Sequence, residues 1–478
     1  MVKKVIFLLT FLGTVLISCS DNHPFPRNLS NSVTFDLDSI RARGKLIAVT
    51  DFNSTNYFIY KGEPMGFHYE LLKSFSDYIG IDLEIISENN LENAYSMLKS
   101  GEADLLAIGL TVNTSGKKEI LFSEPFDETR QVLVQRKPRN WRSLTAEAVD
   151  KRLIRNQTGL AKKTIYVQKG SSDVERLVSL ANEIGDSINI IEVPYESEKL
   201  IKHVATGEIE YTVCDENVAL VNATYYPDID VSTPVSFPQS QAWGIRINNS
   251  SALQTELNKW INTYKKSGSY SLLYAKYFRN SRSSSIVKSD YYALNTGKVS
   301  QYDDLIKESS TTINWDWRLL ASLICQESRF DPNVRSLAGA FGLMQIMPET
   351  GRNFGIDSTA SPKKNIIAGI RYINWLHTIF DSKIKDENER LRFILASYNA
   401  GPGHVLDAMK LAEKNGMDPQ KWEGNVAIWL TKKSQPKYFN DAVVKNGYFR
   451  GTESVAFVSE ILNRYEHYKN IIPGEKTK

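Results

Sequence analysis

The chain is poor in cysteine and histidine, and neither residue forms a familiar metal or redox motif. Its 478 residues include three cysteines and six histidines. Three cysteines cannot build a disulfide framework, and no C-x-x-C pair occurs. No H-E-x-x-H is present, which excludes a zincin site. The sequence therefore predicts no metal site. Cys214 and Cys325 are predicted to be unpaired residues of the core.

An excess of charge of one sign is also lacking. There are 58 Lys and Arg against 55 Asp and Glu, a net charge of +3. Such a balance creates no field for a polyanion, so nucleic acid is not expected as a partner. With 42% hydrophobic residues, 27 Gly and 16 Pro, a collagen-like or wholly disordered chain is excluded. The length predicts about three compact units.

The N-terminal apolar run is too short to cross a membrane. It spans residues 5–17, whereas a spanning helix needs about 20 residues. Two lysines precede it, as is typical of a secretory signal peptide. The run ends L-I-S-C, which resembles the bacterial lipobox. The resemblance implies removal of residues 1–18, lipid attachment at Cys19 and a membrane anchor. Ser20 favours the periplasmic face of the outer membrane. An ordinary signal peptide with an incidental cysteine is the alternative.

Residues 19–44 are polar and are predicted to be a tether. In residues 45–279, strand and helix patterns alternate in two successive series. Such alternation predicts helices covering a parallel or mixed sheet, and two series predict two lobes. Ligands of open α/β sheets bind at the carboxyl ends of the strands, so the cleft between the lobes is the expected site.

The order of motifs in this region resembles the family 3 extracellular solute-binding proteins. L-K-S-G-E-A-D at 98–104 is followed by Thr111 and by F-S-E-P-F at 122–126. The resemblance implies a two-lobed α/β fold like that of periplasmic binding proteins, with Thr111 and Asp215 as candidate ligand residues in the cleft. Asp215 could equally be a helix N-cap. Gly116 stands where the family has a carboxylate-binding Arg, so cell-wall peptides or muropeptides are the candidate ligands.

After residue 279 the alternating strand and helix pattern ends. A serine-rich stretch makes 280–300 the predicted linker, and helical patterns dominate residues 301–470. Glu327 follows Leu323 and Ile324 at helical spacing, so it shares their buried face. Burial raises the pKa of a carboxyl group, and a general acid needs that shift.

The residues around Glu327 resemble the catalytic segment of lytic transglycosylases with an SLT domain. Residues 327–348 read E-S-R-F-D-P-N-V-R-S-L-A-G-A-F-G-L-M-Q-I-M-P, and N-I-I-A-G-I-R-Y and A-S-Y-N-A-G-P-G follow at 365–372 and 396–403. The resemblance implies a mainly α, lysozyme-like domain that acts on peptidoglycan glycan strands without a cofactor. It makes Glu327 catalytic, Ser336 the residue that orients it, and Gln345, Tyr398 and Asn399 the residues that hold the substrate.

The motifs supply only one convincing acid group. Hydrolysis of a glycosidic bond normally needs two carboxyl groups, and these motifs supply only Glu327, which suffices if no water is activated. The resemblance implies a lyase in which the C6 hydroxyl of the sugar is the nucleophile and a 1,6-anhydromuramoyl product forms. Two alternatives are a catalytically inactive peptide- or solute-binding sensor and a lysozyme-type hydrolase.

Overall fold

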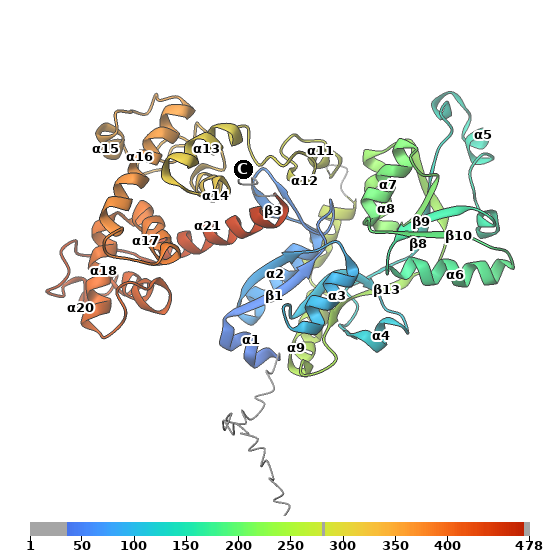
Figure 1. Cartoon of the computed structure of the whole chain (residues 1–478), viewed down its shortest axis with the longest axis horizontal. Helices are drawn as coiled ribbons and strands as arrows, with labels where there is room; N and C mark the ends of the chain where they lie inside the picture. Colours follow the sequence, from blue (N-terminus) through green and yellow to red (C-terminus); the bar gives the residue numbers. More distant parts are fainter. Residues whose placement is uncertain (1–35, 280–282, 473–478) are drawn as a thin grey trace, which may run out of the picture.

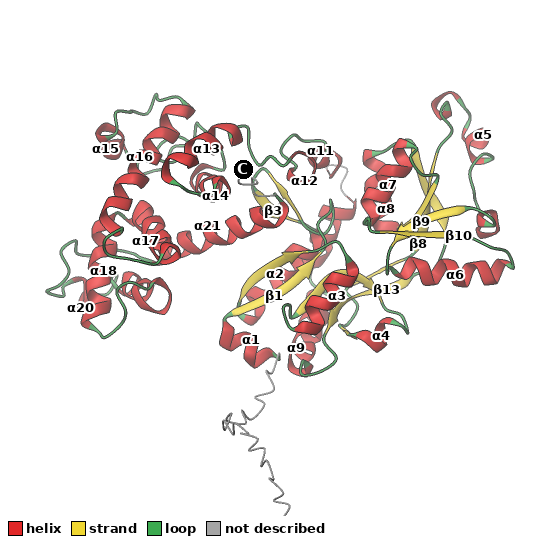
Figure 2. Cartoon of the chain, in the orientation of Figure 1, coloured by secondary structure: helices red, strands yellow, loops and turns green. Residues whose placement is uncertain are grey.

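The computed structural model describes residues 36–279 and 283–472. The predicted signal peptide, the lipid attachment site at Cys19 and most of the predicted tether lie outside these residues. Figure 1 shows an α/β part with two lobes, followed by a helical part coloured yellow to red. Strands are concentrated in the two lobes, and the C-terminal part is almost wholly helical (Figure 2). Within the described residues, no helix combines the length and hydrophobicity needed to cross a membrane.

The first lobe is a mixed β-sheet. Its strand order is β4-β1-β5-β13-β6, and β7 pairs with β13. β1 runs parallel to β4 and β5, whereas β13 runs antiparallel to β5. The elements of this lobe are α1 (Leu37–Arg43), β1 (Lys45–Thr50), β2 (Phe58–Tyr60), β3 (Glu63–Met65), α2 (Phe67–Ile79), β4 (Asp82–Ser87), α3 (Leu91–Ser100), β5 (Leu105–Thr111), α4 (Gly116–Glu119), β6 (Leu121–Phe122), β7 (Asp127–Thr129), β13 (Gln239–Ile245), α9 (Ser251–Tyr264), α10 (Gly268–Tyr274) and η3 (Ala275–Arg279).

Helices pack on both faces of this sheet, because successive side chains of a strand point to opposite faces. Leu105 of β5 joins a cluster with α1, α2, α9 and α10. Leu106 joins a second cluster with α3. Residues 37–43, predicted to belong to the tether, form α1, whose Leu37 and Ile40 are buried in the first cluster. The folded lobe therefore begins before the expected boundary.

The second lobe repeats this plan. Its strand order is β10-β9-β11-β8-β12, with α6 packed on one face and α7 and α8 on the other. The chain crosses between the two lobes at Arg130, which lies between β7 and β8, and at residues 235–238, which lie between β12 and β13. Its elements are β8 (Gln131–Arg136), η1 (Trp141–Ser143), α5 (Ala146–Asp150), η2 (Gln157–Leu160), β9 (Thr164–Gln168), α6 (Ser172–Ile184), β10 (Asn189–Val193), α7 (Ser197–Thr206), β11 (Tyr211–Asp215), α8 (Glu216–Tyr225) and β12 (Ile229–Pro234).

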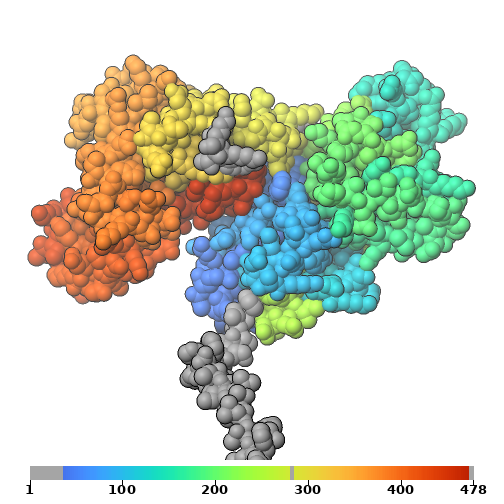
Figure 3. Space-filling view, viewed as in Figure 1, coloured from blue at the N-terminus to red at the C-terminus, as the bar shows by residue number. Residues whose placement is uncertain are grey.

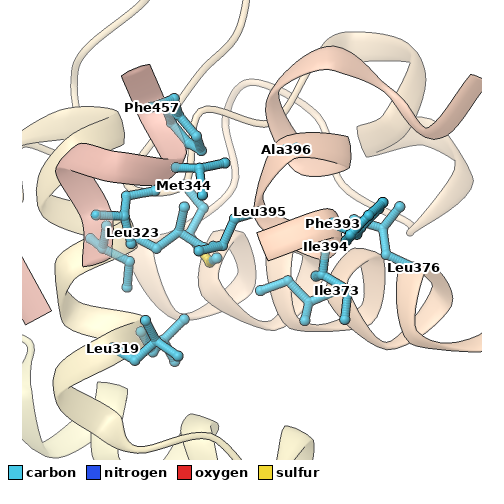
Figure 4. Packing of buried hydrophobic residues seen from close by; sticks show 14 of the residues in the cluster. Leu319, Leu323, Met344, Ile373, Leu376, Phe393, Ile394, Leu395, Ala396 and Phe457 are labelled. Carbon is cyan, nitrogen blue, oxygen red and sulfur yellow. The ribbon is translucent and has the colours of Figure 1, made fainter. Parts of the chain in front are cut away.

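The C-terminal part is a helical domain around one large apolar core. Figure 4 shows part of that core, where Leu323 of α14 and Met344 lie close to Leu395 of α17. The elements that follow η3 in the chain are α11 (Ser283–Val287), α12 (Ala293–Thr296), α13 (Asp303–Ser310), η4 (Thr311–Ile313), α14 (Trp317–Ser328), α15 (Pro348–Asn353), α16 (Pro362–Phe380), α17 (Glu387–Ala400), α18 (Pro402–Lys414), η5 (Trp422–Val426), α19 (Ala427–Lys432), α20 (Pro436–Phe439) and α21 (Thr452–Ile471).

The two domains share a contact at the end of the last helix. The C-terminal end of α21 lies against the first lobe, beside the β2–β3 hairpin (Figures 1 and 3). The predicted linker also packs there, because Tyr292 is buried and its ring lies 5.5 Å from that of Phe58. The free cysteines Cys214 and Cys325 are both buried, as expected from the sequence.

Candidate functional site

Glu327 occupies the last turn of α14, the most deeply buried helix of the C-terminal domain. The helix begins at Trp317, where the Asp316 side chain accepts a hydrogen bond from Arg318 N. Leu323 and Ile324 anchor the same face in the core. The Glu327 side chain forms no hydrogen bond or ion pair with any described residue, and burial raises its pKa to about 8. At neutral pH the carboxyl group is therefore mostly protonated and able to donate a proton.

A loop of residues 331–347 lies beside this carboxyl group and is held by part-buried hydrogen bonds. Tyr398 of α17 donates its hydroxyl to Met344 O at 2.8 Å. Burial and the neighbouring Glu327 raise the pKa of Tyr398 well above its usual value. Gln345 has φ of 44°, and its Nε2 donates to Val334 O and Gly342 O. The Tyr398 hydroxyl and the Gln345 amide nitrogen thus hold the loop, and the Gln345 Oε1 accepts no hydrogen bond within the described residues.

The structure brings Tyr398 to Glu327 but does not join Ser336 to it. The Ser336 side chain is exposed, and its Oγ accepts from Ala340 N at 3.0 Å. No hydrogen bond links it to Glu327 within the described residues. Asn399 is exposed at the end of α17, where its Oδ1 accepts from Ser454 Oγ at 2.6 Å. Ser336 therefore closes the turn of the loop in this conformation, and Asn399 is held by α21.

Three supporting residues were not singled out from the sequence. Tyr372 packs its ring 5.3 Å from that of Tyr398, and burial raises its pKa to about 12. Asn365 Oδ1 accepts from Met344 N, and its Nδ2 donates to Phe341 O. Ser454 holds Asn399. Asn365 and Tyr372 lie in the quoted motif block at 365–372, which was the available signal but did not reveal their roles.

No second carboxylate is positioned with Glu327. Asp331 is the nearest in sequence, but it is exposed and its Oδ1 accepts from Asn333 N at 2.8 Å, a turn hydrogen bond. Burial alone accounts for the raised pKa of Glu327, whereas a close carboxylate would add a further rise. The described residues thus offer one acid group rather than the pair that hydrolysis requires.

A second candidate site lies between the lobes, where a cavity of about 1020 Å³ contains Thr111 and Asp215 in its lining. Gln241 of β13 joins them, because its Nε2 donates to Thr111 Oγ1 at 3.1 Å and Asp215 Oδ2 at 3.4 Å. Asp215 is the N-cap residue of α8 but makes no capping hydrogen bond with its side chain. Burial raises its pKa well above the usual range.

Gly116, where the family has its Arg, also lines this cavity. A Cβ atom there would lie 2.8 Å from Asn113 Oδ1 and from Phe122 Cζ. The packing around Gly116 thus leaves no room for a side chain in this conformation. The cavity is also lined by acidic residues that the sequence did not single out. They lie at the ends of strands or helices, which was the available signal: Asp51, Asp127, Asp173, Glu196 and Glu198.

Comparison with known proteins agrees with both halves of the structure. Residues 46–280 match the bacterial extracellular solute-binding proteins, family 3, and residues 304–420 match the transglycosylase SLT domain. Among solved structures, holo ArgBP from T. maritima is 23% identical, covers 51% of this chain and 99% of its own, and has a TM-score of 0.41.

Curated relatives match almost the whole chain. The membrane-bound lytic murein transglycosylase F of Desulfosudis oleivorans is 33% identical over 90% of this chain and 91% of its own length. That of Pseudomonas fluorescens is 31% identical over 90% and 86%. Fold and site together define a modular protein in which a two-lobed solute-binding domain precedes an SLT-type catalytic domain. The chain belongs to the family of membrane-bound lytic murein transglycosylases F.

Proposed function

We propose that the C-terminal domain is a peptidoglycan lytic transglycosylase in which Glu327 acts first as an acid and then as a base. The observation that carries this proposal is a single half-buried carboxyl group, desolvated enough that its pKa is raised to about 8. Protonated Glu327 donates to the oxygen that leaves the β-1,4 bond between MurNAc and GlcNAc. The resulting carboxylate removes the proton of the C6 hydroxyl, which attacks C1 and forms the 1,6-anhydro ring. No water is consumed.

Tyr398, Gln345 and Asn399 are proposed to hold the sugar next to Glu327. The charge of Glu327 contributes to the raised pKa of Tyr398, and Gln345 is fixed in the adjoining loop, which supports this assignment. Ser336 is proposed to orient Glu327 once the substrate is bound, through a rotation of its exposed hydroxyl away from Ala340 N. In apo geometry, catalytic hydrogen bonds are often absent and form only with substrate.

Mass spectrometry of digested murein tests the proposal. The wild-type enzyme is expected to release anhydro-muropeptides, which are one water lighter than products with reducing ends. Glu327→Gln is expected to keep the thermal unfolding of the wild type and to release no product. Reducing ends would instead identify a lysozyme-type hydrolase. If the wild type releases no product, the protein is a sensor. If the Glu327→Gln variant keeps near-wild-type activity, Glu327 is not the catalytic residue.

The solute-binding domain is proposed to regulate or position the catalytic domain, with cell-wall peptides or muropeptides as candidate ligands. The loop 51–57 supports this role, because Asp51 and Asn56 line the cavity while Tyr57 reaches α21. Tyr57 Oη lies 2.8 Å from His467 Nδ1. Beyond this loop, Gly62 O accepts a hydrogen bond from the Cys325 thiol at 3.7 Å. One short segment therefore links the cavity to the helix that carries Glu327.

A lipid anchor at Cys19 on the periplasmic face of the outer membrane is proposed from the lipobox. Two or more acyl chains are needed to hold a soluble domain on a bilayer. We expect Cys19→Ala to abolish labelling by radioactive palmitate and to release the protein from the membrane fraction, while murein cleavage in solution persists. Unchanged palmitate labelling in that variant would contradict the assignment.

A further inference from the structure

The cavity between the lobes is strongly acidic. Nine Asp and Glu residues line it, against two basic residues, Lys99 and Lys118. Lys99 already forms an ion pair with Glu119, and Lys118 is exposed. Most of the carboxyl groups form no ion pair within the described residues; these seven are Asp51, Asp127, Asp173, Glu175, Glu196, Glu198 and Asp215. Burial raises the pKa of Asp51 and Asp173 to about 6, which reflects the absence of a compensating positive charge.

Three of these carboxyl groups stand at the N-termini of the helices of the second lobe. Asp173 lies in the first turn of α6, and Glu196 and Asp215 are the N-cap residues of α7 and α8. The N-terminus of a helix normally attracts an anion, including the carboxylate of a ligand. Here acidic side chains of the protein lie at those helix ends, and Glu196 accepts hydrogen bonds from Glu198 N and Lys199 N of α7. A carboxylate of the ligand would therefore lie beside carboxyl groups of the protein.

An independent observation is a buried hydrogen-bond acceptor in the lining that has no donor among the described residues. The Gln241 side chain is 3% exposed, and its Oε1 accepts no hydrogen bond. This oxygen lies against Gly109 in the lining, 3.2 Å from the position that a Cβ of Gly109 would take. The Nε2 of the same amide is already used by Thr111 and Asp215. A buried acceptor without a donor is unfavourable, so a ligand N–H group would satisfy it.

We infer that this cleft takes an organic cation that carries two or more amino or guanidino groups and is recognised through these groups, not through a carboxylate. Within the described residues, no three carboxyl, imidazole or thiol groups converge to hold a metal ion. The inference rests on the proposed role of this domain in receiving a ligand. An amine-bearing cell-wall peptide and a free polyamine share the required chemistry.

Calorimetric titration of the full chain in detergent, without murein, tests the inference. The probes are spermidine, argininamide, L-arginine, L-glutamate, MgCl₂, and a cell-wall peptide before and after N-acetylation. We expect argininamide to bind at least as tightly as L-arginine, and acetylation to weaken the peptide about tenfold or more. If the unmodified peptide binds more tightly than spermidine, the ligand class is an amine-bearing cell-wall peptide. If spermidine binds more tightly, the ligand class is a polyamine. The inference is overturned if L-glutamate or Mg²⁺ binds best, or if no cation binds.

Substitutions of acidic residues in the lining test whether the cation binds in this cavity. Asp173→Asn and Asp215→Asn are expected to weaken cation binding about tenfold or more. Glu183→Gln, also on α6 but outside the lining, is expected to bind like the wild type. Wild-type affinity in both Asp variants, with unchanged thermal unfolding, would overturn the inference. Because binding is measured without murein, its failure leaves the proposed cleavage by Glu327 to be judged separately by the products.

Discussion

The Tyr468 hydroxyl donates a 2.8 Å hydrogen bond to Gly62 O, so the last helix of the catalytic domain is joined to a hairpin of the solute-binding domain. Both residues are part of a contact that includes an Arg464–Glu63 ion pair at 3.5 Å and a hydrogen bond from Asn470 Nδ2 to Ile85 O at 2.6 Å. A change at this contact should affect both domains.

Gly62→Ala should disrupt the domain contact. Gly62 has φ of +80°, and an added Cβ would lie 2.6 Å from Phe330 Cε2 and 2.7 Å from Tyr468 Oη. We expect a loss of about 1–3 kcal/mol in the free energy of unfolding from the clash, with murein cleavage reduced or no longer responsive to cleft ligands. Thermal unfolding and cleavage assays on the full chain measure this.

Gly80→Ala is the matched control. Gly80 also has positive φ, +69°, but a Cβ there would meet nothing within 4 Å. Both variants carry the same backbone strain of about 1–2 kcal/mol, so the difference between them reports the clash. Equal unfolding free energies and equal cleavage rates in the two variants would contradict a functional contact at the hairpin.

The pH profile of cleavage should follow Glu327. Its pKa is raised to about 8 by burial, and the first step needs its protonated form. We expect kcat/KM to be high below that pH and to fall about tenfold per unit above it. The measurement is the initial rate of muropeptide release between pH 6 and pH 10. A rate that rises from pH 7 to pH 9 would show that the group acts first as a base.

Tyr398→Phe should loosen the loop next to Glu327. The substitution leaves Met344 O without the hydroxyl that donates to it. Leaving a buried acceptor unpaired should reduce the free energy of unfolding by about 1–3 kcal/mol, and kcat should fall because the loop no longer fixes Gln345. Tyr438→Phe is the control, since its hydroxyl forms no hydrogen bond within the described residues. A Tyr398→Phe enzyme as stable and active as this control would refute the role.

Lys433→Met should destabilise the catalytic domain. Lys433 is fully buried, and its Nζ lies 2.7 Å from Asp407 Oδ2 and 2.8 Å from His404 Nδ1. Removal of one partner of a buried ion pair typically costs about 3–5 kcal/mol. Lys414→Met, which breaks the exposed pair with Asp441, should cost less than about 1 kcal/mol. Chemical unfolding compares the two, and similar losses would contradict the argument.

Much of the fold could be predicted from periodicity and caps. α7 (Ser197–Thr206) is an example, because its apolar residues recur at helical spacing and the helix ends at Gly207. The helix that carries Glu327 was predicted for the same reason. Residues 37–43 were not recognised as a helix, since seven residues are too few for a clear period.

Contacts between distant residues could not be predicted. Tyr57 and His467 are separated by 410 residues, and no local pattern relates them. The hydrogen bond of Ser336 with Ala340 N depends on how the loop turns, which the motif does not specify. Likewise, the acidic residues of the cleft come from separate strand and helix ends, and only the folded sheets bring them to one cavity.

The β2–β3 hairpin has an evolutionary consequence. Ile59, which belongs to the solute-binding domain, is fully buried within the apolar core of the catalytic domain. Its size and shape are therefore constrained by residues more than two hundred positions away, so substitutions on either side of the contact should co-vary. If recombination replaced the first domain with a solute-binding domain that lacks a matching hairpin, a cavity would remain in the core of the second domain. The two domains are thus expected to be inherited as one unit.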